Sequence, residues 1–188
     1  MRLHPGRRPA RPVSGQGREM SDTMAPFNRP QVTLNGCRLV RGLSAAESSW
    51  IGERLSGIDP WLTLGYSPSA LAGYLLRDDP ALHRFLVRVK GVPAGVMAIR
   101  YPWLRGPYIE LLGLAPEFQG IGIGGELLRW AEAEAAAVSG NLWVAVSETN
   151  ERARFFYGNA GFVPVGRLEG LVRPGMDEWL LRKRLNGD

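Results

Sequence analysis

The sequence has 188 residues, of which 45% are apolar and 22% charged, which is the composition of one globular domain rather than two. No segment approaches the roughly 20 consecutive apolar residues of a membrane-spanning helix, so we expect a cytoplasmic protein without a membrane partner. The formal charge of +5 is concentrated in residues 1–30, whose six arginines and two acidic residues leave only +1 for the other 158. This distribution removes most of the support for a basic nucleic-acid-binding stripe on the folded part, so we expect no nucleic-acid partner.

Residues 1–30 are rich in Arg, Pro, Gly and Ser and have almost no apolar periodicity. Such a segment buries too little apolar surface to offset the loss of chain entropy, so we predict a disordered tail. An organelle-targeting leader is one alternative, although three prolines among the first twelve residues would break its amphipathic helix. A start assigned too early, with Met20 or Met24 as the true first residue, is another. Residues 31–188 are predicted to form a single domain.

The chain has one cysteine, Cys37, and two histidines, His4 and His83. A single cysteine forms no internal disulfide, and so few His and Cys residues do not make a typical zinc site, so we expect no metal. We interpret Cys37 as a small apolar core residue and His83 as a strand residue.

Capping, turn and alternation signals predict the elements of the first half of the chain. In order, they are a strand over 37–41, a helix from the Ser44 and Glu47 capping box to about Ser56, a helix from Ser67 and Pro68 to about Arg77, hairpin strands over 85–90 and 95–101 around a turn at 91–93, and a strand over 107–114.

The second half begins with a glycine-rich loop and a helix over 124–138 that ends before Gly140. A strand over 142–147, a helix capped by Thr149 or Asn150 that ends near Gly161, and strands over 162–166 and 179–184 follow. Because a helix joins them, the strands over 107–114 and 142–147 should run parallel within an otherwise antiparallel sheet. The fold class is therefore α/β (α+β) with a mixed sheet.

Four glycines lie in six residues between a strand and a helix: Gly120, Gly122, Gly124 and Gly125. Backbone amides that point outward at a helix N-terminus suit a phosphate or pyrophosphate, whereas a plain flexible connector is the alternative. The run also matches the dinucleotide pattern G-x-G-x-x-G, with Glu148 as a candidate ribose-binding acid. Two observations argue against a dinucleotide site. Four residues separate the strand from the glycines, where a dinucleotide-binding fold turns directly, and the 40 residues after Glu148 are too few for its second half.

Two motifs point to a known family. The run Gln119, Gly120, Ile121, Gly122, Ile123, Gly124 resembles the Q/R-x-x-G-x-G/A pyrophosphate loop of GNAT-type N-acetyltransferases. Residues 150–162 resemble the family's second motif, N-x-x-A-x-x-x-Y-x-x-x-G-F, at Asn150, Ala153, Tyr157, Gly161 and Phe162. The resemblance spans roughly residues 37–185. It implies a mostly antiparallel central sheet with one splayed parallel pair and helices on both faces.

The resemblance also implies acetyl-CoA as co-substrate. Pantetheine would bind the backbone of Leu112 and Leu114, and the Leu114 amide would polarise the thioester carbonyl. Asn150 would contact the pantetheine arm through its side chain. The pyrophosphate would bind the loop that contains Gln119, Gly120, Ile121, Gly122, Ile123, Gly124 and Gly125.

Tyr157 is the candidate general acid that protonates the departing thiolate. Helical spacing places it on one face with Ala153, Phe156 and Ala160, and it holds the family's acid position in the second motif. The alternative is a core tyrosine with a satisfied hydroxyl.

Glu110 is the candidate base. Strand alternation would place four side chains on one face of a covered strand: Tyr108, Glu110, Leu112 and Leu114. A carboxylate there is costly without a partner or a function, and Glu110 stands four residues before the last pantetheine contact, where family members often carry a base. The alternative is a structural carboxylate paired with Arg100 or Arg105.

Trp61, Tyr66 and Trp103 are candidates for the walls of an amine pocket, with ordinary core packing as the alternative. The predicted function is acetyl transfer from acetyl-CoA to a primary amine in a ternary complex. The acceptor would be a small molecule or a protein or peptide amine, and the protein a monomer or homodimer. Alternatives are an inactive acyl-CoA-binding regulatory module and a nucleotide-binding oxidoreductase.

Overall fold

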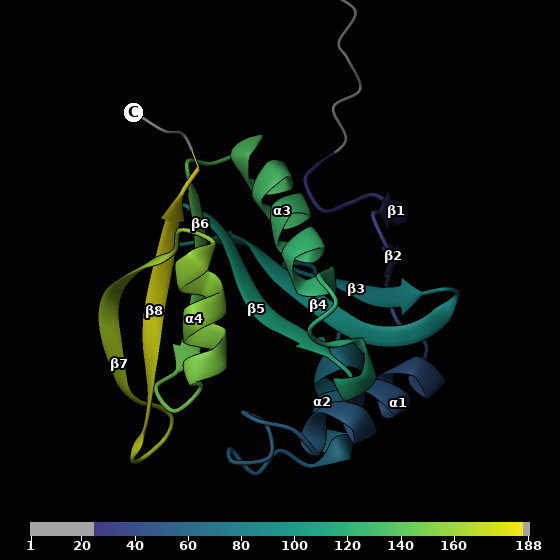
Figure 1. Cartoon of the computed structure of the whole chain (residues 1–188), viewed down its shortest axis with the longest axis horizontal. Helices are drawn as coiled ribbons and strands as arrows, with labels where there is room; N and C mark the ends of the chain where they lie inside the picture. The colour runs from purple at the N-terminus through teal and green to yellow at the C-terminus, as the bar shows by residue number, and fades with distance from the viewer. Residues whose placement is uncertain (1–24, 186–188) are drawn as a thin grey trace, which may run out of the picture.

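An eight-stranded mixed sheet runs through the computed structural model, which describes residues 25–185 (Figure 1). The strand order is β1-β2-β3-β4-β5-β6-β8-β7, and only β5 and β6 run parallel. The strands are β1 (Gln31–Leu34), β2 (Cys37–Arg41), β3 (Leu82–Val89), β4 (Val92–Trp103), β5 (Gly106–Leu114), β6 (Asn141–Ser147), β7 (Val163–Arg173) and β8 (Met176–Arg184). The helices are α1 (Ala45–Ser56), α2 (Pro68–Leu76), the short 3-10 helix η1 (Pro116–Phe118), α3 (Ile123–Ala136) and α4 (Glu151–Asn159).

This architecture confirms the predicted mixed sheet, with α3 as the crossover between the two parallel strands. Several boundaries differ from those predicted. The four-residue strand β1 was not predicted, and β7 extends to Arg173 because it pairs with β8 along a long hairpin. Helix α3 ends at Ala136, two residues before the predicted end at Val138, whose side chain is 40% exposed.

Residues 25–30 are part of the described fold, although the sequence analysis assigned them to the tail. The Phe27 side chain is fully buried, with its ring centroid 5.9 Å from that of Trp130 in an edge-to-face arrangement. The Phe27 amide also donates a hydrogen bond to Glu134 Oε2 at 3.0 Å. A large aromatic anchor thus attaches this segment to α3. The rest of the predicted tail, residues 1–24, lies outside the described residues.

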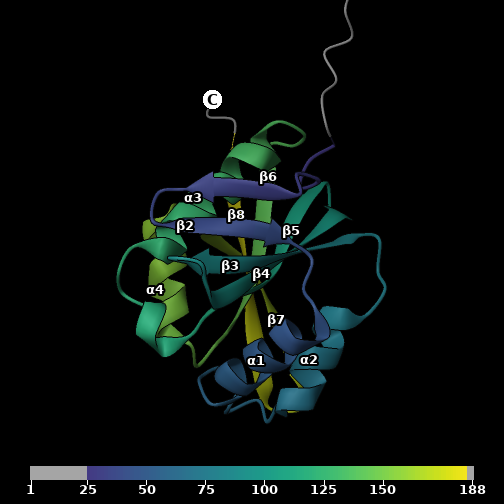
Figure 2. The same ribbon diagram turned by 90° about the vertical axis from the view of Figure 1, so that its right-hand side faces the viewer.

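The two faces of the sheet carry separate apolar cores. Figures 1 and 2 show the helix pair α3 and α4 and the helix pair α1 and α2 at different sides of the sheet. Helices α3 and α4 cover one face through residues such as Leu127, Ala131 and Tyr157. Helices α1 and α2 cover the other through Leu55 and Leu71. Within residues 25–185 no helix is long and apolar enough to span a membrane.

A β-bulge in β5 changes which face its side chains occupy. Ala98 pairs with Leu111 and Ile99 with Ile109, so Glu110 is an extra residue on β5. Ile109 packs in the α3 core and Leu111 in the α1 core, and Glu110 bonds to α2. The expectation that Tyr108, Glu110, Leu112 and Leu114 share one face is therefore wrong, because the bulge interrupts the alternation. Leu112 and Leu114 pack toward α3 instead.

The parallel strands β5 and β6 pair only at Tyr108 with Trp143 and at Ile109 with Val144. Beyond these pairs β5 stays with β4 as far as Leu114, while β6 stays with β8 as far as Ser147. The sheet therefore splays open toward the carboxyl ends of its central strands. That is where ligands bind in open α/β sheets.

Candidate active site

The glycine loop positions the N-terminus of α3 at the mouth of this gap. Gly120 and Gly122 have φ values of 75° and 90°, which glycine adopts without strain. Gly122 is the N-cap of α3 and provides no side-chain cap, whereas Ser44, Ser67 and Asn150 cap the other three α-helices. The first-turn amides, which include those of Gly124 and Gly125, have no acceptor within the helix. They form an electropositive site suited to an anion.

Gln119 holds the loop in place through two hydrogen bonds. Its Nε2 donates to the Leu114 carbonyl at 2.7 Å, and its Oε1 accepts from Arg152 Nη1 at 2.7 Å. The side chain thus ties the end of β5 to the start of α4. Arg152, which the sequence motifs did not identify, is an exposed cation that lines the cavity beside the uncapped helix end. Its position two residues after the Asn150 cap is the signal that could have identified it.

A cavity of about 380 Å³, the glycine-loop cavity, extends from this loop along the end of β5 to the first turns of α4. Nine of the predicted site residues line it: Leu112, Leu114, Gln119, Gly120, Gly122, Gly124, Gly125, Asn150 and Tyr157. The side chains of Ile121 and Ile123 do not line it. Ile121 is 63% exposed to solvent, and Ile123 is buried in the core.

Asn150 has two structural roles at this gap. Its Oδ1 accepts a hydrogen bond from the Ala153 amide at 3.0 Å and thereby caps α4. The residue also lines the glycine-loop cavity, so its amide nitrogen is the group left for a ligand.

Tyr157 is buried in α4 between the rings of Phe156 and Phe162, at centroid distances of 5.0 and 5.3 Å. Burial raises the pKa of the Tyr157 phenol, and the neighbouring Tyr108 phenol raises it further. The hydroxyl therefore keeps its proton at neutral pH, as a proton donor must.

A second cavity of about 350 Å³, the aromatic cavity, lies on the α2 side of the same gap. It shares six residues with the glycine-loop cavity: Pro60, Trp61, Leu112, Asn150, Ala153 and Tyr157. Trp61 and Tyr66 line it, as the sequence analysis suggested for an amine pocket. Trp103 does not. It stacks on Tyr108 at a centroid distance of 4.6 Å, behind the wall.

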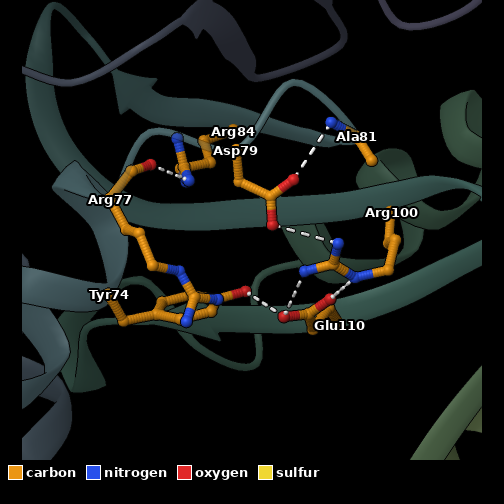
Figure 3. A network of polar contacts seen from close by, with 7 residues as sticks. All are labelled: Tyr74, Arg77, Asp79, Ala81, Arg84, Arg100 and Glu110. Atoms are coloured by element: carbon orange, nitrogen blue, oxygen red, sulfur yellow. Dashed lines mark hydrogen bonds and ion pairs between the residues drawn. The ribbon is translucent and has the colours of Figure 1, made fainter.

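Glu110 lines the aromatic cavity, but both of its oxygens are engaged (Figure 3). Arg100 donates through Nε to one oxygen and through Nη2 to the other at 3.2 Å. The Tyr74 hydroxyl donates to the second oxygen at 3.0 Å, and Arg100 also bonds Asp79 at 3.1 Å. Arg100 is thus the partner that the structural alternative for Glu110 named. Arg105 is not, because the ion pair of Glu110 within residues 25–185 is with Arg100; the backbone carbonyl of Arg105 accepts hydrogen bonds from Ser139 and Asn141.

A sequence model of the acetyltransferase (GNAT) family matches residues 49–162, which is more than half of the chain. The chain belongs to the GNAT family. It is therefore an acetyltransferase, and the mixed sheet with one parallel pair is the fold of that family. None of the curated proteins compared with the sequence matches it.

Solved structures of several acetyltransferases are similar to this chain. An acetyltransferase from Elizabethkingia anophelis with acetyl-CoA bound is 18% identical, with 80% of this chain and 99% of that chain covered and a TM-score of 0.61. The ribosomal-protein-S18-alanine N-acetyltransferase of Escherichia coli is 16% identical, with 81% of this chain and 96% of that chain covered and a TM-score of 0.63. Nourseothricin acetyltransferase is 27% identical, with 60% of this chain and 70% of that chain covered and a TM-score of 0.52.

Proposed function

We propose that the protein transfers the acetyl group of acetyl-CoA to a primary amine in a ternary complex. The observation that carries this proposal is the meeting of two cavities at Tyr157, one beside an uncapped helix N-terminus and the other lined by aromatic side chains. Each cavity has the volume of a small-molecule site, roughly 300–1,000 Å³. Similar GNAT structures include one with acetyl-CoA bound, which supports the co-substrate.

The residues of the glycine-loop cavity fit acetyl-CoA. Gly120 and Gly122 leave open space where a side chain would stand, and the amides of the first α3 turn would hold the pyrophosphate. Leu112 and Leu114 border the gap that would take the pantetheine arm. When bound, acetyl-CoA supplies a thioester that is reactive toward an amine.

Tyr157 is the proposed acid, because its phenol is buried, protonated and shared by both cavities. A covalent acetyl-enzyme is not proposed. Cys37, the single cysteine, is buried beneath α3, where burial and then Glu126 raise the pKa of its thiol and so reduce its reactivity. Direct transfer needs no such nucleophile.

Glu110 was the predicted base, and we propose a positioning role for it instead. Its two oxygens accept three hydrogen bonds from Arg100 and Tyr74, so taking up a proton would disrupt the network that joins α2, β4 and β5. In this arrangement Glu110 fixes the wall of the aromatic cavity.

The test is acetyl-CoA consumption by the purified full chain across a panel of small amines and amine-bearing peptides. Turnover with an amine, lost on Tyr157→Phe, would support the proposal. Acetyl-CoA binding without turnover on any amine would favour the regulatory module. Thermal stabilisation by NAD(H) but not by coenzyme A would favour the oxidoreductase, which the family assignment does not support.

A further inference from the structure

Glu178 extends from β8 into the aromatic cavity. Its carboxylate accepts a hydrogen bond at 3.0 Å from the hydroxyl of Ser147. Ser147 is the residue of β6 that pairs with Glu178 of β8 in the sheet. The next residues of the same strand, Trp179 and Leu181, contribute to the α3 core. This alternation turns Glu178 toward the opposite face, where the cavity lies.

Glu178 differs from Glu110 in having no counter-ion. Within residues 25–185 no Lys, Arg or His lies within ion-pair distance of it, whereas Arg100 holds Glu110. Burial raises the pKa of Glu178, and the Ser147 hydrogen bond opposes that shift only in part. A desolvated carboxylate without a partner is costly, and a cationic ligand would remove that cost.

The titratable side chains that face this carboxylate across the cavity come from α2, β5, α4 and the α1–α2 connection: Tyr66, Tyr74, Tyr108, Glu110 and Tyr157. Among the described lining residues there is no Lys or Arg. Burial raises the pKa of Tyr108, and Glu178 and then Glu110 raise it further, so this phenol stays neutral beside both carboxylates. The Tyr108 phenol in turn adds to the rise that burial causes in the pKa of Tyr157. Glu178, Tyr108 and Tyr157 all line the aromatic cavity.

The roof of the aromatic cavity restricts the size of its ligand. This roof consists of Leu64 and Tyr66 from the α1–α2 connection and of Leu171 and Val172 from the β7–β8 hairpin, all of which line the cavity. A hydrogen bond of 2.7 Å from Arg173 to the Thr63 carbonyl ties these segments together, and Figure 1 shows the connection beside the hairpin tip. The cavity behind this roof has room for a small molecule.

We propose that Glu178 is the catalytic base and that the acceptor is a compact cationic amine without a carboxylate next to its amino group. This inference rests on the proposed function and names its acceptor class. The uncompensated carboxylate binds the ammonium group, while the aromatic walls provide cation–π contacts. A carboxylate on the acceptor would add a second negative charge beside Glu178, with no cation in the lining to offset it.

The proton balance is complete with the residues present. The bound ammonium gives one proton to the Glu178 carboxylate, and the freed nitrogen lone pair forms the N–C bond to the acetyl carbonyl. The C–S bond breaks, and its electron pair takes the proton of the Tyr157 hydroxyl. The second amine proton returns to the Tyr157 oxygen, and Glu178 releases its proton to water. The products are an N-acetyl amine, coenzyme A thiol and one proton.

The acceptor class is tested with matched pairs that differ by one carboxylate: tyramine and tyrosine, putrescine and ornithine, agmatine and arginine. For the wild-type full chain at saturating acetyl-CoA, we expect kcat/KM for the better amine to exceed that of its amino acid at least about tenfold. Equal or better use of the amino acid overturns the acceptor class.

The base is tested with the Glu178→Gln variant on the best amine. We expect kcat/KM to fall roughly 10²- to 10⁴-fold near neutral pH, with the KM for acetyl-CoA unchanged. In the wild type, kcat/KM should rise with pH as Glu178 ionises, and the variant should lose this rise. Instead, kcat/KM of the variant should increase with the fraction of unprotonated amine, up to the pKa of the amine itself. A purely structural role would not change the pH profile in this way.

Glu169→Gln is the matched control, because Glu169 is an exposed carboxylate on the same hairpin. It should retain the wild-type rate and pH profile. If Glu178→Gln does not fold, the Glu178→Asp variant tests the same role. It keeps a carboxylate but moves it back toward the β8 backbone by one methylene, and we expect kcat/KM to fall at least about tenfold. Wild-type turnover that survives both variants overturns the base assignment and leaves the acetyltransferase proposal intact. No turnover of any panel amine by the wild type overturns both.

Discussion

Gly122 provides a direct test of how the glycine loop is built. It is the N-cap of α3 with φ 90° and ψ −9°, and a Cβ added there meets no protein atom within 4 Å. The cost of Gly122→Ala in the free protein is therefore conformational, about 1–2 kcal/mol for a left-handed alanine. For a protein of this size that corresponds to a loss of roughly 2–8 °C in Tm.

The same methyl group would project into the glycine-loop cavity, where the pyrophosphate is proposed to bind. We expect the KM for acetyl-CoA to rise roughly tenfold, equivalent to about 1.4 kcal/mol of binding free energy. Thermal melting by circular dichroism and initial rates of coenzyme A release measure the two effects separately.

Gly158→Ala is the matched control, because Gly158 lies within α4 and its added Cβ also meets nothing within 4 Å. Alanine there should stabilise the protein by about 0.5–1 kcal/mol and leave the KM for acetyl-CoA unchanged. If Gly122→Ala left both Tm and KM at wild-type values, or if both variants destabilised equally, the assignment of the loop would be refuted.

Three further predictions follow from buried groups. Tyr157→Phe keeps the ring packing and removes the proton donor, so kcat should fall roughly 10²- to 10⁴-fold while Tm changes little, as rate assays and melting would show. Phe27→Ala should lower the free energy of unfolding by about 3–5 kcal/mol in urea titrations, because it empties the site against Trp130; a loss below about 1 kcal/mol would contradict that anchor. Glu178→Gln should stabilise the fold above the carboxyl pKa of the unfolded chain, about 4.3. Because burial raises the pKa of Glu178 in the folded protein, the wild type loses stability as pH rises from the unfolded to the folded pKa of this carboxyl. The gain in stability of the variant should therefore disappear in acid. A gain that does not depend on pH would argue against a burial cost at Glu178.

Short-range signals in the sequence predicted local structure well. Ser44 with Glu47, Ser67, and Asn150 cap three helices as their spacing indicated, since a cap needs only residues within one turn. The glycine loop before α3 and the burial of Tyr157 depend on similarly local patterns. These local features place the glycine loop and Tyr157, the proposed acid, in the fold.

Long-range contacts were not predictable in the same way. Phe27 is buried because α3, about a hundred residues later, packs over it. The bulge at Glu110 depends on the register of β4 against β5, which no pattern within β5 reveals. Among the two arginines named as partners for Glu110, only the folded sheet distinguishes Arg100 from Arg105.

The sequence by itself determined the order of the elements other than β1 and η1, the capped helices and the glycine loop that leaves one helix end open, because each is set by neighbours along the chain. Only the tertiary structure decided the chemistry of the two carboxylates. Arg100 forms an ion pair with Glu110 and Tyr74 donates a hydrogen bond to it, both from other elements. Glu178 lies in the same cavity with a hydrogen bond from Ser147 but, within residues 25–185, without an ion-pair partner. A carboxylate's role depends on which charges the fold brings near it, and sequence spacing does not encode that.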